Sequence, residues 1–329
     1  MRQYPTIGVA GAGAWGLALA NAAASAGRSV AVWDNDAASM RELERTRRSA
    51  RLPGVELAVA VRVSGDLDGL EPSDAVLVAV PAQATRQAAK SVAAALSRPR
   101  PLVACAKGIE RGADRFMTEV LGEAAPGWRN AILSGPSFAA DVAAGLPTAV
   151  TLASADEELA RGLCAALRGP GLRLYHSTDV RGVEIGGAAK NVLAIACGVA
   201  AGLGLGASAG AALIARGFAE LRRFGEAFGA RPNTLMGLSG LGDLVLTCTS
   251  AQSRNFAFGR ALGQGRSVAE AGAGPLAEGA FTASALMRLA RARGVEMPIS
   301  ATVEALLEGT IDARAAVVAL LARPQKGEE

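Results

Sequence analysis

The sequence predicts an α/β protein with two parts, a doubly wound sheet followed by an all-helical domain. Three observations lead to this prediction. A glycine-rich turn follows the first apolar segment, and short apolar segments then alternate with helical segments up to about residue 183. After that point the chain is rich in Ala and Gly and nearly free of strand-like segments. We therefore expect a first domain over residues 1–183 and a second over residues 184–329.

The first unit of the pattern is strand, turn, helix, strand and acid. Residues 6–11 predict a short buried strand, residues 14–26 a helix of small residues, and residues 28–34 a second strand that ends in Asp34. This order, with an acid shortly after the second strand, is typical of a Rossmann-like dinucleotide-binding domain.

The turn itself has the spacing G-x-G-x-x-G, formed by Gly11, Gly13 and Gly16. Gly11 would allow the tight turn, Gly13 would let a pyrophosphate approach the backbone, and Gly16 would let the helix lie close to the sheet. The free N–H groups at the start of the helix would face the phosphates. We therefore expect a dinucleotide cofactor here.

Two stretches without charge raise the alternative of a signal peptide or a membrane span. Residues 7–27 resemble a signal peptide weakly, but their interior glycines disfavour a helical apolar region. Residues 191–215 carry Gly198, Gly202, Gly206 and Gly210 at four-residue spacing, as in membrane helix dimers. Since this run is dominated by Ala and Gly, we favour buried core helices broken by the glycines, without stable membrane insertion.

Further strand-like segments extend the predicted parallel sheet. They occupy residues 74–83, 101–110, 130–138, 147–154 and 172–177, with a helical segment at residues 84–96. Ligands bind such sheets at the carboxyl ends of the strands. The loops there hold Pro81, Gln83, Lys107 and residues 134–137.

Composition excludes several classes of function. The net charge of +4 is small for 329 residues, and Arg45, Arg47, Arg48 and Arg51 are typical of a solvated helix end, so we expect no nucleic-acid partner. The single histidine, His176, is predicted in a loop, and no metal-ligand spacing occurs. The four cysteines, without a C-x-x-C pair, are interpreted as reduced, buried thiols.

Lys190 and Asp243 are candidates for chemistry. Lys190 follows Gly186 and Gly187 at the start of a long apolar helix, where small neighbours would leave room for another molecule. Partial burial would suit such a lysine to proton transfer, but it could equally extend from a helix end into solvent. Asp243 is either a helix cap or a functional carboxylate, with Thr247 on the same helical face.

Ser253, Arg254 and Asn255 form a candidate phosphate site. Ser253 has the chemistry of an N-cap, and the next two residues fall in the first helical turn. The helix dipole, its free N–H groups and a guanidinium all favour an anion. An ordinary capped surface helix is the alternative.

Together these segments resemble bacterial NAD(P)-dependent glycerol-3-phosphate dehydrogenases. The similarity extends over almost the whole chain and is carried by these segments in order: GAGAWGLALA, LPGVEL, AKGIE, LSGPSFAADVAAGLPTAV, GVEIGGAAKNVLAIACGVAAGLGLG, GLSGLGDLVLTCTSAQSRNFAFG and GVEMPIS. AAKNVLAI, GLGDL and SRN are the most specific of them. The resemblance implies reduction of dihydroxyacetone phosphate to sn-glycerol 3-phosphate for phospholipid synthesis, in a cytoplasmic homodimer.

The resemblance also implies residue roles. Lys190 would donate and accept the proton, Asp243 would pair with it and with the substrate hydroxyls, and Lys107 would contact substrate and cofactor. Other residues implied to contact the substrate are Gly135, Ser137, Asn191, Thr247, Ser253, Arg254 and Asn255. Those implied to contact the cofactor are Ala14, Trp15, Ala139, Arg254, Leu276 and Glu278, beside the glycine turn.

The sequence departs from many bacterial members at two places. Asp34 and Asn35 stand where a basic residue or histidine would suit the 2′-phosphate of NADP, so we predict a preference for NAD(H), which Arg28 or the arginines at 45–51 could offset. Residues 207–210 replace polar and basic residues. The open alternatives for function are a related reductase of another 2-keto or 2-hydroxy acid and a dinucleotide-binding sensor without turnover.

Overall fold

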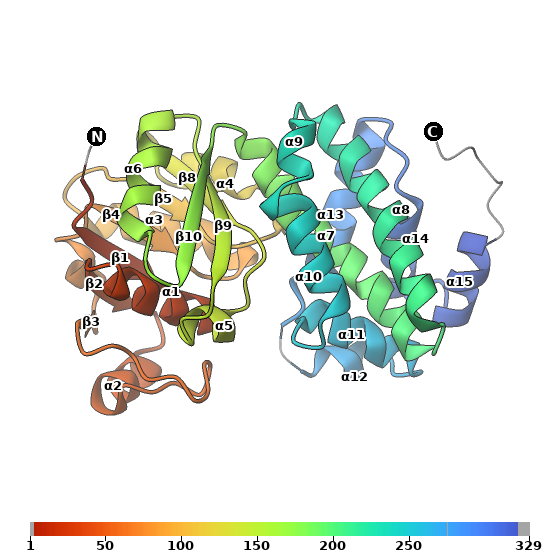
Figure 1. The fold of residues 1–329 in the computed structure, drawn as a ribbon, viewed down its shortest axis with the longest axis horizontal. Coiled ribbons are helices and arrows are strands. Elements are labelled where there is room, and N and C mark those ends of the chain that lie inside the picture. The colour runs from red at the N-terminus through yellow and green to blue at the C-terminus, as the bar shows by residue number, and fades with distance from the viewer. Residues whose placement is uncertain (1–2, 275, 322–329) are drawn as a thin grey trace. The chain divides into compact units, whose positions relative to one another are not determined.

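A computed structural model describes residues 3–274 and 276–321 of the chain (Figure 1). The chain forms two compact units. The first contains residues 1–110 and 115–184, and the second contains residues 111–114 and 185–329. The prediction from the sequence divided the chain between residues 183 and 184 and did not separate residues 111–114.

An eight-stranded sheet forms the centre of the first unit, with the strand order β10-β9-β8-β5-β4-β1-β2-β3. The strands among the described residues of this unit are β1 (Thr6–Ala10), β2 (Ser29–Trp33), β3 (Val61–Val63), β4 (Ala75–Val78), β5 (Leu102–Ala104), β6 (Ile109–Glu110), β7 (Arg115–Phe116), β8 (Asn130–Ser134), β9 (Thr148–Ala153) and β10 (Leu172–Ser177). β6 and β7 form a separate antiparallel hairpin. Parallel pairing in register joins β1 to β2 and to β4, as the alternation of strands and helices predicts.

The prediction of a wholly parallel sheet was wrong at one edge. β9 pairs with β8 in the antiparallel direction, and β10 continues parallel to β9. The only helix between β8 and β9 is α5 (Ala139–Ala143). Five helical residues rise about 7 Å, whereas a parallel return has to cross the length of a strand. The chain therefore reverses direction and enters the sheet from the same end.

Helices cover both faces of the sheet. The helices of this unit, besides α5, are α1 (Ala14–Ser25), α2 (Ala37–Thr46), η1 (Leu67–Leu70), η2 (Ala82–Ala84), α3 (Thr85–Ala95), α4 (Met117–Ala124) and α6 (Glu157–Leu167). One hydrophobic cluster contains residues of α1, α2, α5 and α6 together with Val103 of β5. The other contains residues of α3 and α4 together with Leu102 and Ala104, which precede and follow Val103 in the same strand. Successive residues of β5 therefore face opposite helical layers, as β geometry requires.

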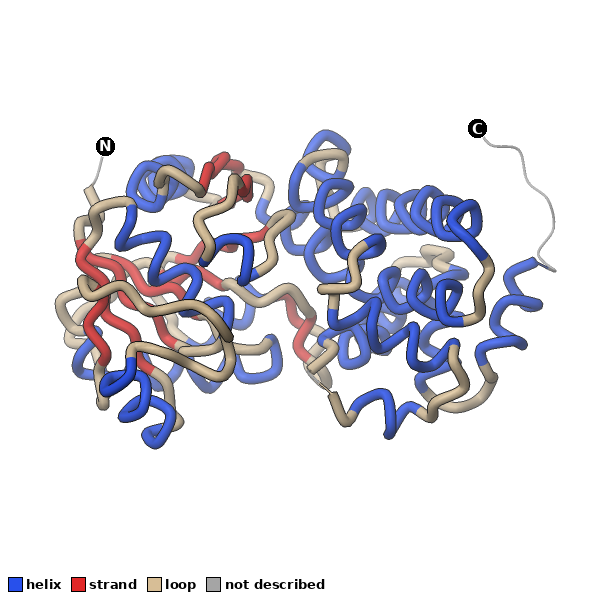
Figure 2. The backbone as a smooth tube through the Cα atoms, turned by 60° about the horizontal axis from the view of Figure 1, so that its bottom comes forward, coloured by secondary structure: helices blue, strands red, loops and turns tan. Residues whose placement is uncertain are grey.

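The described residues of the second unit form helices and loops only (Figure 2). Its elements are the greater part of α7 (Val180–Gly202), then α8 (Gly206–Ala227), α9 (Pro232–Leu235), the π-helical turn η3 (Leu238–Gly242), α10 (Asp243–Thr249), α11 (Arg254–Gly263), α12 (Val268–Gly272), α13 (Glu278–Ala292), α14 (Pro298–Leu307) and α15 (Ala313–Leu321). α7 is the one described helix long and apolar enough to span a membrane, and 83% of its most apolar window is buried inside the protein.

The glycine spacing of α7 is explained by close packing against α11. A Cβ at Gly198 would overlap the carbonyl oxygen of Phe256, and a Cβ at Gly259 would overlap that of Ile195. Gly202 and Gly263 repeat this relation one turn further on. Gly198 and Gly202 of the small-residue pattern therefore belong to a helix crossing inside the protein, whereas a Cβ at Gly206 or Gly210 would meet open space. α7 ends at Gly202, where the sequence predicts a break.

Two smaller predictions concern His176 and the cysteines. His176 lies within β10 rather than in a loop, with its side chain 43% exposed and 3.8 Å from Glu157. All four cysteines are free and buried, as predicted. Burial raises the pKa of Cys105 and of Cys164 to about 12, so these thiols are protonated and unreactive at neutral pH.

Candidate active site

The glycine turn between β1 and α1 has the geometry of a phosphate-binding loop. Gly11 has φ +114°, and a Cβ there would lie 2.6 Å from the carbonyl oxygen of Ala79, so only glycine fits. A Cβ at Gly16 would overlap the carbonyl oxygen of Gly11, whereas the space around Gly13 is open. No side chain caps the N-terminus of α1, which leaves its amides available to an anion.

Asp34 is bound to the turn that it follows in sequence. Its Oδ2 accepts a hydrogen bond from the backbone N–H of Ala12 at 2.8 Å, and its Oδ1 accepts one from the N–H of Asp36 at 3.1 Å. The carboxylate therefore fixes the shape of the turn and still has lone pairs for another donor.

One arginine of the basic group reaches this carboxylate. Arg51 places its Nη1 3.3 Å from Oδ2 of Asp34 and its Nη2 3.2 Å from Oδ2 of Asp36. The other three are paired elsewhere: Arg45 with Glu42, Arg48 with Glu56, and Arg47 with backbone carbonyls of residues 57–61. Arg28 donates to the carbonyl of Ala26. Arg51 is thus the cation that partly neutralises Asp34.

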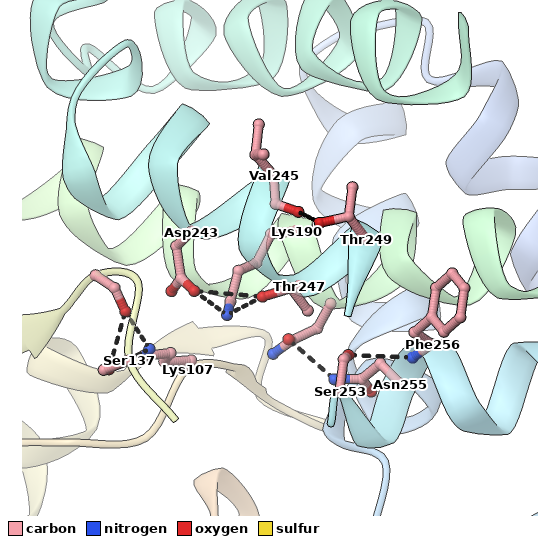
Figure 3. Close-up of polar contacts among 12 residues, drawn as sticks. Lys107, Ser137, Lys190, Asp243, Val245, Thr247, Thr249, Ser253, Asn255 and Phe256 are labelled. Atoms are coloured by element: carbon pink, nitrogen blue, oxygen red, sulfur yellow. Dashed lines mark hydrogen bonds and ion pairs between the residues drawn. The ribbon is translucent and has the colours of Figure 1, made fainter. Parts of the chain in front are cut away.

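Lys107 joins three loops at the carboxyl ends of the strands. It follows β5, and its Nζ donates to the carbonyl oxygen of Gly135 at 2.7 Å and lies 3.4 Å from the hydroxyl of Ser137, both in the loop after β8 (Figure 3). The same ammonium lies 5.9 Å from the ring centroid of Trp15 in the glycine turn. The structure therefore brings together the four predicted residues Trp15, Lys107, Gly135 and Ser137.

Lys190, Asp243 and Thr247 form a buried polar cluster in the second unit. The Nζ of Lys190 lies 2.6 Å from Oδ1 of Asp243 and 2.7 Å from Oγ1 of Thr247 (Figure 3). Thr247 is 3.3 Å from Oδ1 of Asp243, as their i, i+4 spacing predicts. The side chains of Lys190 and Asp243 are only 7% and 1% exposed. Burial of a charge pair costs desolvation energy that can exceed the attraction gained, so stability alone does not explain this pair.

Two interpretations of Lys190 from the sequence were wrong. α7 begins at Val180, so Lys190 lies in the middle of the helix and does not extend from its end. Gly186 does not leave space for another molecule, because a Cβ there would overlap the carbonyl oxygen of Ser239 in η3. Instead, Gly186 lets η3 pack tightly on α7 one turn before Lys190. Asp243 directly follows η3 in the chain, so the packing of η3 on α7 places its carboxylate beside Lys190.

The thiols of Cys197 and Cys248 adjoin this cluster. Contact with the Cys197 thiol and burial raise the pKa of Cys248 well above its usual range, while the charges of Lys190 and Asp243 have smaller and opposite effects. A neutral thiol next to a charge pair acts as apolar packing rather than as a nucleophile.

The N-terminus of α11 carries the predicted phosphate residues. Ser253 caps the helix by accepting a hydrogen bond from the N–H of Phe256 at 3.2 Å, and the side chain of Arg254 is exposed. Asn255 is buried; its Nδ2 donates to Oδ1 of Asn191 at 2.9 Å, and its Oδ1 accepts from the N–H of Gly279 at 2.9 Å. The side chain of Asn255 in α11 therefore binds both α7 and the start of α13.

The remaining predicted residues lie at the ends of elements. Ala14 begins α1, Asn35 is exposed after β2, Ala139 begins α5, and Glu278 begins α13. Leu276 precedes α13 with 39% of its surface exposed. None of these five is among the clusters described above. The hydrogen bond from the N–H of Gly279, which directly follows Glu278, was not predicted, because it joins positions 24 residues apart in the chain.

Comparison with known proteins agrees with this architecture. The N-terminal model of the NAD-dependent glycerol-3-phosphate dehydrogenases matches residues 6–160, and the C-terminal model matches residues 179–318. A protein from Azorhizobium caulinodans named glycerol-3-phosphate dehydrogenase [NAD(P)+] is 60% identical over 329 residues, with both chains fully covered. One of the same name from Methylobacterium radiotolerans is 59% identical over 330 residues, covering 100% of this chain and 99% of the other.

Solved structures extend the agreement. The crystal structure of a glycerol-3-phosphate dehydrogenase from Coxiella burnetii has a TM-score of 0.92 and 38% identity, covering 98% of this chain and 99% of that one. A ketopantoate reductase from Ralstonia eutropha, with a TM-score of 0.61 and 16% identity, shares the fold alone. The chain belongs to the NAD-dependent glycerol-3-phosphate dehydrogenase family.

Proposed function

We propose that the protein interconverts dihydroxyacetone phosphate and sn-glycerol 3-phosphate with NAD(P)H. The observation that carries this proposal is the buried cluster of Lys190, Asp243 and Thr247 in a chain of this family. Asn191 follows Lys190 in α7 and accepts a hydrogen bond from Asn255 at the arginine-bearing start of α11. α7 therefore carries the proposed acid for the carbonyl oxygen next to a residue that is bound to the proposed phosphate site.

The residues present fit a nicotinamide dinucleotide. Gly11 and Gly16 bring the turn and α1 together, Gly13 leaves space above the backbone, and the start of α1 offers uncapped amides to the pyrophosphate. When bound, the nicotinamide supplies a hydride to the carbonyl carbon in reduction and takes it back in oxidation.

Lys190 acts as the general acid in the direction of reduction. As the carbonyl carbon gains the hydride, the carbonyl oxygen becomes an alkoxide, and the ammonium of Lys190 donates a proton to it. The carboxylate of Asp243, 2.6 Å away, orients the ammonium and stabilises its charge, and its oxygens can accept hydrogen bonds from substrate hydroxyls. In the reverse direction the neutral amine takes the hydroxyl proton.

The phosphate would bind at the start of α11. Arg254 supplies an exposed guanidinium, and the helix supplies a positive dipole end. In the first unit, Lys107 is held by Gly135 and beside Ser137 and Trp15, which supports its proposed contact with substrate and cofactor. We propose Ala14, Ala139, Leu276 and Glu278 as further cofactor contacts on the strength of the family resemblance.

We propose NADH as the preferred cofactor. The carboxylate of Asp34 can accept a hydrogen bond from the ribose and repels a 2′-phosphate. Arg51, at 3.3 Å, weakens this repulsion, so NADPH is expected to be used less well rather than excluded. We also propose that the enzyme is a cytoplasmic homodimer that supplies glycerol phosphate for phospholipid synthesis, as the resemblance implies.

A substrate panel tests the proposed function. Purified protein is incubated with NADH or NADPH and with dihydroxyacetone phosphate, dihydroxyacetone, pyruvate or ketopantoate, and cofactor oxidation is followed by absorbance. Rapid oxidation only with the phosphorylated ketone is expected. Preferred turnover of a 2-keto acid would support the related reductase instead, and cofactor binding without turnover of any ketone would support a sensor.

A further inference from the structure

We propose that Glu184 is a positioning residue for Lys190, acting through the helix that both share. The proposal rests on the function proposed above. Its basis is the cluster formed by Phe116, Thr118, Glu119, Arg181 and Glu184, which we call the α7 anchor. These residues hold the first turn of α7 inside the first unit, whereas Lys190 and its partners lie in the second.

α7 is one continuous helix that contributes to two cores. Residues 180–184 belong to the first unit and residues 185–202 to the second. Val183 is fully buried in the hydrophobic cluster formed with α3 and α4, while residues from Ile185 onward are buried among helices of the second unit. Within one continuous helix, the rotation of an early turn sets the direction in which the later side chains point.

Glu184 fixes that first turn by binding the start of α4. Its Oε1 accepts hydrogen bonds from the backbone N–H of Thr118 at 2.7 Å and from the Thr118 hydroxyl at 2.8 Å. The Nη1 of Arg181 lies 3.3 Å from its Oε2. The side chain of Glu184 is only 2% exposed, so Oε1 depends on the two Thr118 donors, while Oε2 has the charge of Arg181 nearby but no hydrogen bond among the described residues.

The rest of the anchor holds Arg181. The Nη2 of Arg181 lies 2.6 Å from Oε1 of Glu119, and its guanidinium lies 3.9 Å from the ring centroid of Phe116. Glu119 in turn accepts a hydrogen bond at 2.9 Å from the N–H of Phe116, the N-cap residue of α4. Arginine on an aromatic face between two carboxylates has little freedom to move.

Because α7 is one helix, a rotation of its first turn changes the position of the Lys190 ammonium. Lys190 lies six positions after Glu184, which corresponds to about 9 Å along the axis. Side chains extend about 5–6 Å from the axis, so a rotation of about 20° at the anchor would displace the Lys190 ammonium by about 2 Å. A displacement of about 1 Å between a catalytic group and its target can cost about 100-fold in rate. The negative charge of Glu184 strengthens its two hydrogen bonds from Thr118 and its ion pair with Arg181, and these contacts together resist such a rotation. Glutamine keeps the acceptor oxygen but lacks the charge.

Glu184→Gln is the principal test, and Glu220→Gln is its matched control. Glu220 is also a buried carboxylate that binds the start of another helix: it accepts hydrogen bonds from the N–H groups of Ile299 and Ser300 and from the Ser300 hydroxyl, at the start of α14. It lies in α8, outside the proposed catalytic machinery. We expect Glu184→Gln to lower kcat about tenfold or more at about pH 8.5, with the KM for each substrate within about twofold of wild type. Glu220→Gln should lower Tm by a similar amount but keep the wild-type kcat.

A pH series separates positioning from a purely structural role. The charged groups that face Glu184 are Arg181 on its own helix and Glu119 on α4. Burial raises the pKa of Glu184 to about 7, so below that pH the wild-type side chain is protonated and resembles glutamine. The ratio of wild-type kcat to Glu184→Gln kcat should therefore shrink as the pH falls from about 8.5 to about 6.

Thr118 provides a second test that does not alter a buried charge. Thr118→Val removes the hydroxyl and keeps the backbone N–H, and we expect it to lower kcat severalfold, while Thr118→Ser retains both donors and should match wild type. The inference is overturned if Glu184→Gln and Thr118→Val keep the wild-type kcat, or if Glu220→Gln lowers kcat as much as Glu184→Gln does. If Glu184→Gln does not fold, the two Thr118 variants decide. Absence of any turnover by the wild type would instead refute the proposed function.

Discussion

At the scale of single residues, the pairing of Lys190 explains how a charged lysine can be buried. Asp243 and Thr247 replace the water that the ammonium loses, and Asp243 supplies the opposite charge. We predict that Lys190→Ala lowers kcat by about 10²–10⁴, the range for a lost general acid, while cofactor binding measured by fluorescence is retained. A wild-type kcat in this variant would remove Lys190 from the mechanism.

Arg51 allows a prediction about cofactor choice. Arg51→Gln removes the cation that neutralises Asp34, so kcat/KM for NADPH should fall about 10–100-fold, in keeping with the loss of a charge-assisted hydrogen bond. The value for NADH should stay within about twofold. Arg48→Gln is the matched control, because this neighbouring arginine pairs with Glu56 and should leave both values unchanged. Equal losses for both cofactors in Arg51→Gln would contradict the role of Arg51.

Residue types and spacing predicted the candidates but not their environment. The i, i+4 relation of Asp243 and Thr247 follows from the helix repeat alone, and so does the N-cap role of Ser253. Residue types and spacing could not predict that Lys190 is paired with Asp243, because Asp243 is 53 residues away in the chain and the contact depends on how η3 packs; only the family resemblance implied this pair. The same limit applies to Arg51, since four arginines in one segment look alike until their partners are known.

At the scale of elements, the crossing of α7 and α11 places Asn191 beside Asn255. The backbones approach so closely that Gly198 cannot carry a side chain. We predict that Gly198→Ala destabilises the protein by about 1–3 kcal/mol, as overpacking does. Gly210→Ala, on α8 where the added Cβ meets open space, should stabilise it by about 0.5–1 kcal/mol. Urea unfolding of both variants checks this; equal effects would mean that the crossing can relax.

In the first unit, the positions of the strands in the sequence were predicted more fully than their parallel or antiparallel pairing. Strand-forming segments and the glycine turn follow from local pattern, and the predicted strands appear in the structure. The antiparallel edge at β8 and β9 could not be predicted from apolar pattern, since buried strands look alike in either direction. The shortness of α5 was the only local signal.

At the scale of the whole molecule, the buried carboxyl of Glu184 in α7 makes the free energy of unfolding depend on pH. The pKa of Glu184 is raised in the folded state to about 7, above its ordinary value of 4.5, so the folded protein retains a proton that the unfolded chain has lost. The free energy of unfolding of wild type, relative to Glu184→Gln, should therefore fall as pH rises from about 4.5 to about 7, by on the order of 3 kcal/mol. Denaturant unfolding over this range measures it, and a constant difference would contradict the raised pKa.

In the proposed reduction, dihydroxyacetone phosphate receives a hydride from the cofactor and a proton from Lys190. The most direct measurement follows the hydride itself. Wild-type protein is given dihydroxyacetone phosphate and NADH deuterated at both transferable positions of the nicotinamide, and the product is examined by mass spectrometry and NMR. The account predicts sn-glycerol 3-phosphate with one deuterium on its central carbon. Unlabelled product, or no product while cofactor binding is intact, would contradict it.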